Sequence, residues 1–116
     1  MEKKAHVDYD EENDILYVYS GEKVKDSLPI DRFIIDFGSD EKPSGLELLD
    51  ASDFIKNTCG VKIVTSDLNN IKSATLRYWR SNELMFVIVS LFIKIGGKEE
   101  EIKLQAPAPV LAASNR

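Results

Sequence analysis

The sequence is poor in the residues that build disulfides, metal centres and membrane spans. Its 116 residues include one cysteine, one histidine and one tryptophan. Because Cys59 has no second cysteine to bond with, an internal disulfide is excluded, and we expect a reducing, cytoplasmic setting. The longest apolar run, Leu84 to Ile95, has 12 positions, whereas a transmembrane helix needs roughly 17–25 apolar residues. Residues 1–6 lead into no apolar segment, so we expect no secretory signal and no membrane partner.

The motifs that commonly mark catalysis and cofactor binding are also absent. The sequence has no glycine-rich phosphate loop, no nucleophile elbow and no paired-cysteine metal motif. We therefore predict no catalytic residue, no cofactor and no metal. No Gly/Ser-rich linker and no repeat divides the chain, so we expect a single domain over residues 1–116.

The charge is acidic overall and unevenly spread. Residues 1–57 carry 15 acidic and 7 basic side chains, whereas residues 58–116 carry 5 and 8. Neutralisation of phosphate supplies most of the affinity of general DNA binders, so a net charge of −5 makes nucleic acid an unfavoured partner. The acidic half predicts either solvated sheet faces or a surface presented to a basic protein partner.

Period-two alternation of apolar and polar residues predicts strands in the first half of the chain. The predicted strands are Ala5–Asp10, Ile15–Tyr19, Ile30–Phe37 and Gly45–Leu49. A short helix should follow, with Asp50 or Ser52 accepting from its free N–H groups and Gly60 as a left-handed C-terminal cap. Residues 61–70 fit either a strand with a loop or part of a second helix.

The second half reads as a three-strand meander. Ile71–Arg80 and Leu84–Ile95 are its first two strands, and the last strand has Ile102, Leu104 and Ala106 on its inner face. Pro107 and Pro109 should end the pairing, because proline has no N–H for the ladder. The predicted fold class is α+β, mostly antiparallel β: a four-strand sheet with a short helix in residues 5–59, a meander in residues 60–109, and a flexible tail in residues 110–116.

Leu84–Ile95 is apolar on both of its faces. One face carries Met85, Val87 and the odd positions that follow, and the other carries Leu84, Phe86, Ile88 and Phe92. A one-sided sheet would leave the second set in water, so we expect it to be covered by the first-half sheet, by the helix or by a second copy of the protein.

Two stretches of the first half resemble a known family. They are the segment from Val7 to Val18, with its Tyr-Asp-x-x-x-Asp-x-Leu-Tyr pattern, and the segment from Gly45 to Ser52, with Gly-x-Glu-x-Leu-x-Ala-Ser. Together they resemble the DUF2283 family of small domains over about residues 5–55. The resemblance implies an antiparallel sheet followed by a helix, and it transfers no catalytic residue. At Glu41-Lys42-Pro43 the chain departs from the Asp-Gly-type turn of the family.

The candidate site residues of the first half have simple structural interpretations. Asp8, Asp10 and Asp14, together with Glu11 and Glu12, could hold a hard cation, but a Ca²⁺ loop counted from Asp8 lacks its sixth-position glycine and its final glutamate. We favour a solvated hairpin tip with local bonds to turn backbone. For His6 we favour a surface ion pair with Asp8, and for Cys59 buried packing at a helix end, away from the helix N-terminus that activates thiolates.

Arg77-Tyr78-Trp79-Arg80 is the stretch with most character of a binding surface. Alternation places Arg77 and Trp79 on the face opposite Leu76 and Tyr78. An outward tryptophan beside arginine fits a protein interface, a plain packing role or base stacking in nucleic-acid binding.

Our leading functional hypothesis is a non-catalytic protein-interaction module, a homodimer whose acidic half faces a basic partner, with an antitoxin-like role as one form. Its possible interface residues are Arg77, Trp79, Leu84, Phe86 and Phe92. The alternatives are a nucleic-acid binder that uses Lys72, Arg77, Trp79 and Arg80, and a metal-dependent enzyme built on Asp8, Asp10 and Asp14.

Overall fold

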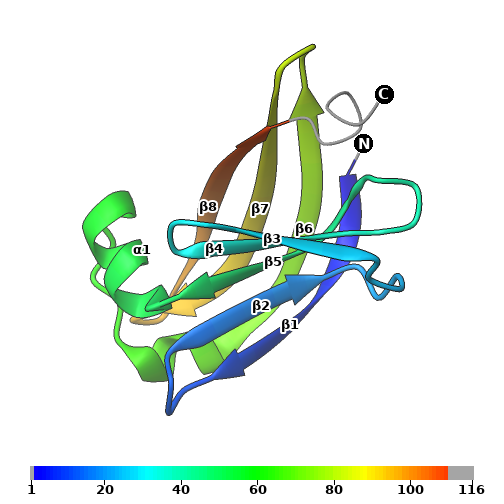
Figure 1. Ribbon diagram of the computed structural model, residues 1–116. Coiled ribbons are helices and arrows are strands. Elements are labelled where there is room, and N and C mark those ends of the chain that lie inside the picture. Colours follow the sequence, from blue (N-terminus) through cyan, green and yellow to red (C-terminus); the bar gives the residue numbers. More distant parts are fainter. Residues whose placement is uncertain (1, 110–116) are drawn as a thin grey trace.

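Residues 2–109 form one eight-stranded antiparallel sheet, one short α-helix and one 3-10 helix. The computed structural model describes residues 2–109, and the strand order is β3-β4-β5-β2-β1-β6-β7-β8 (Figure 1). The predicted fold class is confirmed as mostly antiparallel β with one short helix. The predicted division into a four-strand sheet and a three-strand sheet is wrong, since all eight strands are joined. The tail at residues 110–116 lies outside the described residues.

The elements follow the predicted segments closely in most places. They are β1 (Glu2–Asp10), β2 (Ile15–Tyr19), β3 (Asp26–Ile30), β4 (Phe33–Phe37), β5 (Pro43–Leu49), α1 (Ala51–Cys59), the 3-10 helix η1 (Thr65–Asn70), β6 (Ile71–Arg80), β7 (Leu84–Ile95) and β8 (Lys98–Pro109). Residues 61–70, which the pattern left open, form an extended connection followed by η1. No helix within residues 2–109 has the length and apolar content needed to cross a membrane.

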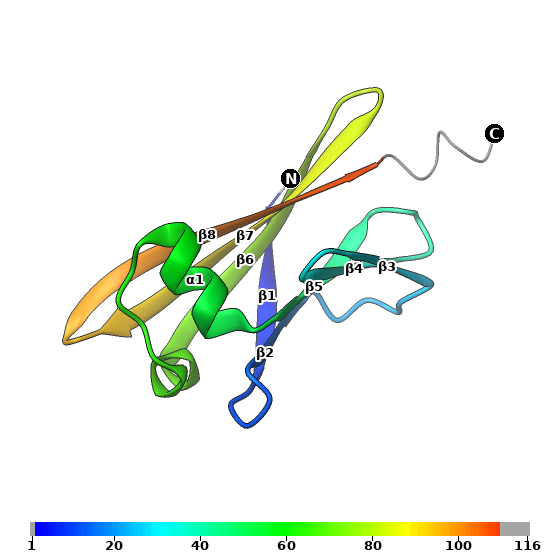
Figure 2. The same ribbon diagram turned by 60° about the vertical axis from the view of Figure 1, so that its left-hand side comes forward.

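Strand β1 joins the two halves of the sheet because it pairs on both sides. Its first residues, Glu2–Ala5, pair with β6, and its later residues, His6–Asp10, pair with β2. We call β2–β5 with residues 6–10 the N-terminal wing, and β6–β8 with residues 2–5 the C-terminal wing. Figure 2 shows the two wings diverging on either side of β1.

A hairpin replaces the third predicted strand. Ile30–Phe37 is interrupted at Asp31 and Arg32, and the segment before it forms β3, which pairs with β4 through Ile30 and Phe33. Asp31 has a φ of 56°, a left-handed conformation that suits a tight turn and that Asp tolerates better than most residues. Arg32 therefore lies in the turn rather than on a strand face.

The prediction that Pro107 and Pro109 end the pairing is also wrong. Strand β8 runs to Pro109, with Phe86 opposite Pro107 and Leu84 opposite Pro109. The reason is that β8 is the last strand of the sheet, and proline is tolerated on an edge strand where its missing N–H faces away from the neighbour.

The helix α1 ends as predicted and begins differently. Gly60 is its C-cap with a φ of 68°, in the left-handed region that glycine favours. Asp50 occupies the N-cap position, but neither its side chain nor that of Ser52 accepts a capping hydrogen bond. Asp14 of the β1–β2 turn accepts from the Ser52 amide at 3.1 Å and from its hydroxyl at 2.7 Å, and the Ala51 amide donates to the Asp14 carbonyl.

The core lies between the two wings, and α1 closes one end of it. Phe54 of α1 packs edge-on against Phe33 of β4, with ring centroids 5.3 Å apart, and Ile55 is fully buried. The inward residues of β7, from Met85 to Ile93 at odd positions, are almost completely buried, as are Ile102, Leu104 and Ala106 of β8. We call the faces that line this core the inner faces and the opposite faces the outer faces.

The outer face of β7 is not covered within the chain. Leu84 is 39% exposed and Phe92 is 38% exposed, whereas Phe86 and Ile88 are half-buried. The prediction that the first-half sheet or the helix covers this face is therefore wrong at Leu84 and Phe92, and cover by a second copy stays a prediction. The N-terminal wing and α1 pack on the inner face of β7 instead. The two wings meet at β1, and their inner faces are turned toward each other across the core.

Candidate functional site

An apolar strip runs along the outer face of the C-terminal wing. We call Trp79, Leu84, Phe86, Ile88 and Phe92 the outer apolar strip. Trp79 lies opposite Phe86 in the register of β6 and β7, and their ring centroids are 5.9 Å apart. Trp79 is 56% exposed, which is a large apolar surface for an isolated soluble chain. All four apolar residues that the sequence singled out for an interface belong to this strip.

Charged residues of both signs surround the outer apolar strip. Residues directly opposite each other on paired strands share a face, so the register identifies the outward positions. These charged positions are Glu2, Lys4, Arg77, Lys94, Glu99, Glu101 and Lys103. Arg77 lies opposite Ile88 and therefore borders the strip, as the sequence predicted. The face as a whole carries no strong excess of either charge.

The two edges of the sheet are poorly suited to pairing with another strand. Pro29 lies in the middle of β3, and Pro107 lies in β8. In the middle of β8, the Cys59 thiol of α1 lies 3.9 Å from the Lys103 carbonyl oxygen. Proline in an edge strand is a device that prevents edge-to-edge association. These prolines disfavour pairing of another strand with either edge of the sheet.

The outer face of the N-terminal wing carries a row of aromatic rings. We call His6, Tyr19 and Tyr17 the aromatic row. The rings of Tyr17 and Tyr19 are stacked with centroids 4.7 Å apart, and the His6 ring lies 5.3 Å from that of Tyr19. The predicted ion pair of His6 with Asp8 does not form; His6 packs on Tyr19, and a hydrogen bond with Asp8 raises the pKa of Tyr19.

A buried carboxylate lies beside the aromatic row. Asp36 is 8% exposed and accepts from the Tyr17 hydroxyl at 2.5 Å and from the Ser27 hydroxyl at 2.7 Å. Burial, with the hydrogen bond from Tyr17 to Asp36 and the nearby charge of Glu47, raises the pKa of Tyr17. A Cβ on Gly45 would lie 3.1 Å from the Asp36 carboxylate, so glycine leaves the room this contact needs.

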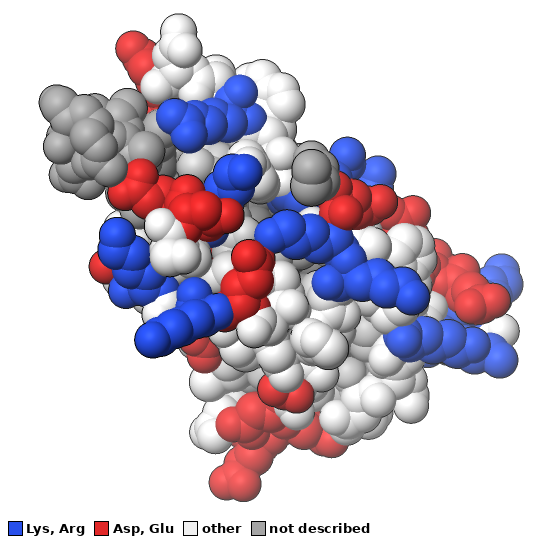
Figure 3. Space-filling view, turned by 90° about the vertical axis from the view of Figure 1, so that its right-hand side faces the viewer, with Lys and Arg blue, Asp and Glu red and all other residues white. Residues whose placement is uncertain are grey.

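The carboxylates of the β1–β2 hairpin do not converge. Asp10 accepts from the backbone and side chain of Asn13, as predicted for a hairpin tip, and these bonds lower the pKa of Asp10. The Asp14 carboxylate instead accepts a hydrogen bond from the Ser52 amide of α1. The Glu11 carboxylate accepts from the Asn69 side chain at 2.5 Å. Within residues 2–109 no group of three or more His, Cys, Asp or Glu side chains is placed to hold a metal ion. Figure 3 shows acidic side chains gathered at the lower end of the molecule, where this hairpin lies in Figure 1.

The basic residues of the nucleic-acid hypothesis do not gather on one surface. Arg77 and Trp79 share the outer face, whereas Arg80 lies opposite the buried Met85 and so belongs to the other side of β6. Lys72 lies 3.7 Å from Glu99 in an exposed ion pair. It also lines an open hollow of about 630 Å³ with Asp67, Lys94 and Gly97, away from Arg80.

Cys59 is expected to react slowly with thiol reagents. Burial raises the pKa of its thiol, which lowers the fraction of reactive thiolate. At about pH 8 we expect the folded chain to react with a disulfide reagent more slowly than the same chain in denaturant. A rate in the folded chain equal to that in denaturant would contradict this expectation.

Comparison with known proteins identifies relatives of the chain. A family model described as "Protein of unknown function (DUF2283)" matches residues 6–52, as the resemblance predicted. The chain is 38% identical over 114 residues to an uncharacterized protein of Methanocaldococcus jannaschii. The aligned region covers 85% of this chain and 97% of that protein. It is 36% identical over 77 residues to a Methanosarcina mazei protein named "Putative hypoxanthine phosphoribosyltransferase", with 66% of this chain and 58% of that protein covered. No solved structure matches the chain.

Proposed function

Because the chain belongs to the DUF2283 family, a family of unknown function, we propose a function from its surfaces: it is a non-catalytic protein-interaction module. Its partner at the outer apolar strip is a second copy of the chain, so that the protein works as a homodimer. The observation that carries this proposal is the exposure of Trp79, Leu84 and Phe92 on one continuous outer face.

The chemistry of the strip supports a protein partner. Tryptophan and arginine are enriched among the residues that dominate protein interfaces, where a central aromatic group is surrounded by polar residues. Trp79 and Phe86 provide the aromatic centre, and Arg77 borders it. Because prolines interrupt the hydrogen-bonding positions of both edge strands, face-to-face packing is the favoured mode of association.

The charge around the strip supports a second copy as the partner. A twofold interface brings the same patch together twice, so a patch of a single sign would repel itself. The outward positions of the C-terminal wing mix lysine and arginine with glutamate, from Glu2 and Lys4 on β1 to Glu101 and Lys103 on β8. This face can therefore place charges of opposite sign next to each other across a twofold interface.

Sedimentation equilibrium tests the homodimer. The wild-type chain is expected to sediment at twice its mass of 13.1 kDa. Trp79→Ser removes the central ring and should weaken the dimer about 30-fold, the size of an interface hot spot of about 2 kcal/mol.

The matched control is Val64→Ser, because Val64 is 60% exposed but lies in the connection before η1. We expect it to leave the dimer unchanged. A chain that stays monomeric at high concentration, or a dimer that responds equally to both substitutions, would rule out the proposed interface.

Nucleic-acid binding is the weaker candidate. The exposed Trp79 beside Arg77 could stack on a base and contact a phosphate. The glutamates on the same face oppose a polyanion, and Lys72 is engaged with Glu99. The antitoxin-like role, which the sequence suggested from size and charge, stays a prediction.

A further inference from the structure

The outer face of the N-terminal wing differs from that of the C-terminal wing in the sign of its charge. By register, its outward strand positions include Asp8, Asp10, Asp36 and Glu47, and none of the outward strand positions described there is lysine or arginine. Such a face repels its own copy, so it cannot serve as a second homodimer interface. Its electrostatic complement is a cation.

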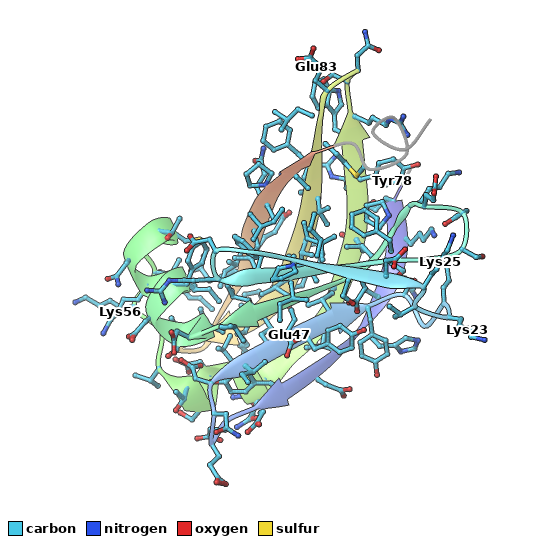
Figure 4. All side chains as sticks on the ribbon, viewed as in Figure 1. Lys23, Lys25, Glu47, Lys56, Tyr78 and Glu83 are labelled. Atoms are coloured by element: carbon cyan, nitrogen blue, oxygen red, sulfur yellow. The ribbon has the colours of Figure 1, made fainter. Side chains whose placement is uncertain are left out.

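Glu47 is the carboxylate of this face that is best placed to receive a cation. It lies on β5 between Tyr17 of β2 and Ile34 of β4 and is half-buried. No lysine or arginine within residues 2–109 forms an ion pair with it. Figure 4 shows it near the middle of the wing. Partial burial without a counter-ion leaves its charge weakly screened, which strengthens attraction to an incoming cation.

The aromatic row supplies the second half of the recognition. Tyr17 lies opposite Glu47 and is stacked on Tyr19, which lies opposite Gly45. The Tyr17 hydroxyl donates to Asp36, and the Tyr19 hydroxyl is hydrogen-bonded to Asp8. An aromatic surface next to carboxylates attracts a cation through the ring as well as through charge. A planar guanidinium can stack on a ring while it donates two parallel hydrogen bonds to a carboxylate, which an ammonium cannot do.

We propose that the aromatic row and Glu47 together form a binding site for an arginine side chain of a basic partner protein. The guanidinium stacks on the tyrosine rings and donates to the Glu47 carboxylate, while Asp8 and Asp36 add to the negative potential. This site lies on the opposite wing from the outer apolar strip and does not depend on the homodimer.

Calorimetric titration with hexa-arginine and hexa-lysine peptides tests the site. Hexa-arginine is expected to bind at low salt, more weakly at high salt, and several-fold more tightly than hexa-lysine. Glu47→Gln should weaken hexa-arginine binding about ten-fold, the effect of losing one charged hydrogen-bonding partner. Equal affinity for the two peptides would exclude an arginine-specific site, and no binding would exclude a cation site.

The matched control is Glu83→Gln. Glu83 is exposed in the β6–β7 turn at the far end of the molecule (Figure 4), so this substitution makes the same change in net charge at a distance from the site. It should weaken hexa-arginine binding by less than two-fold. If the two glutamine variants behave alike, binding reflects overall charge and the site is refuted.

Two further variants test whether hexa-arginine binding depends on the aromatic row or on the homodimer interface. Tyr19→Leu keeps an apolar residue on β2 but removes the stacking ring, and it should weaken hexa-arginine several-fold. Trp79→Ser should leave hexa-arginine binding unchanged, whatever it does to the dimer. Loss of binding in Trp79→Ser, with wild-type affinity in Tyr19→Leu, would place the cation on the other wing and overturn the proposal.

Discussion

Replacing Asp14 with alanine is expected to lower the free energy of unfolding by about 3 kcal/mol. The Asp14 carboxylate accepts from the Ser52 amide, the Ser52 hydroxyl and the Tyr9 hydroxyl, and hydrogen bonds to charged groups contribute about 1.5–3 kcal/mol. Asp14 also has a φ of 56°, which alanine adopts less readily than aspartate. Thermal unfolding should show a fall in Tm of about 10 °C.

The control for Asp14 is Asp10 in the same hairpin. Its carboxylate is exposed and bonds only within the turn, to Asn13, so Asp10→Ala should cost about 1 kcal/mol or less. Asp14→Asn should fall between the two, because asparagine keeps one acceptor oxygen and tolerates the left-handed conformation. Equal losses for Asp10→Ala and Asp14→Ala would show that the link to α1 contributes little.

A second large effect is expected at Leu91 of β7. Leu91 is completely buried in the core, and Leu→Ala substitutions at such sites cost about 2–5 kcal/mol through lost burial and the cavity left behind. We expect Leu91→Ala to lower the free energy of unfolding by about 3 kcal/mol. The free energy of unfolding can be measured by chemical denaturation at protein concentrations where the chain is monomeric.

The neighbouring residue provides the comparison. Phe92 points to the outer face and is 38% exposed, so Phe92→Ala should cost the monomer about 1 kcal/mol, since part of its surface is already in water. Similar losses at the two positions would contradict the assignment of inner and outer faces on β7.

Those two faces illustrate what could be predicted from the sequence. The alternation of apolar residues along Ile71–Arg80 depends only on the two-residue period of a strand, and the long apolar run of Leu84–Ile95 suits a strand, so both strands are confirmed, as is the inward position of Leu76. The same period places Arg77 and Trp79 outward. The hairpin before β8 turns at Gly96 and Gly97, both with positive φ, and the pairing of Ile95 with Lys98 closes it.

The candidate sites were only partly predictable, because their contacts join distant segments. Tyr17 and Asp36 are 19 residues apart, and they meet only because β5 lies between β2 and β4. The spacing of Tyr17 and Tyr19 could have suggested a shared face. The need for glycine at position 45 follows from the closeness of Asp36 and Tyr17, which no local pattern records.

The sequence by itself determined most of the antiparallel strands, though not β3, together with the helix end at Gly60 and the family of the chain. The tertiary structure decided that β1 pairs on both sides, that Asp14 caps a helix 38 residues away, and that the outer apolar strip stays uncovered. The physical reason is that backbone geometry and side-chain alternation act over a few residues, whereas the order of strands in a sheet is a choice among distant partners. The order of the strands in the sheet is what places the residues of the outer apolar strip on one surface.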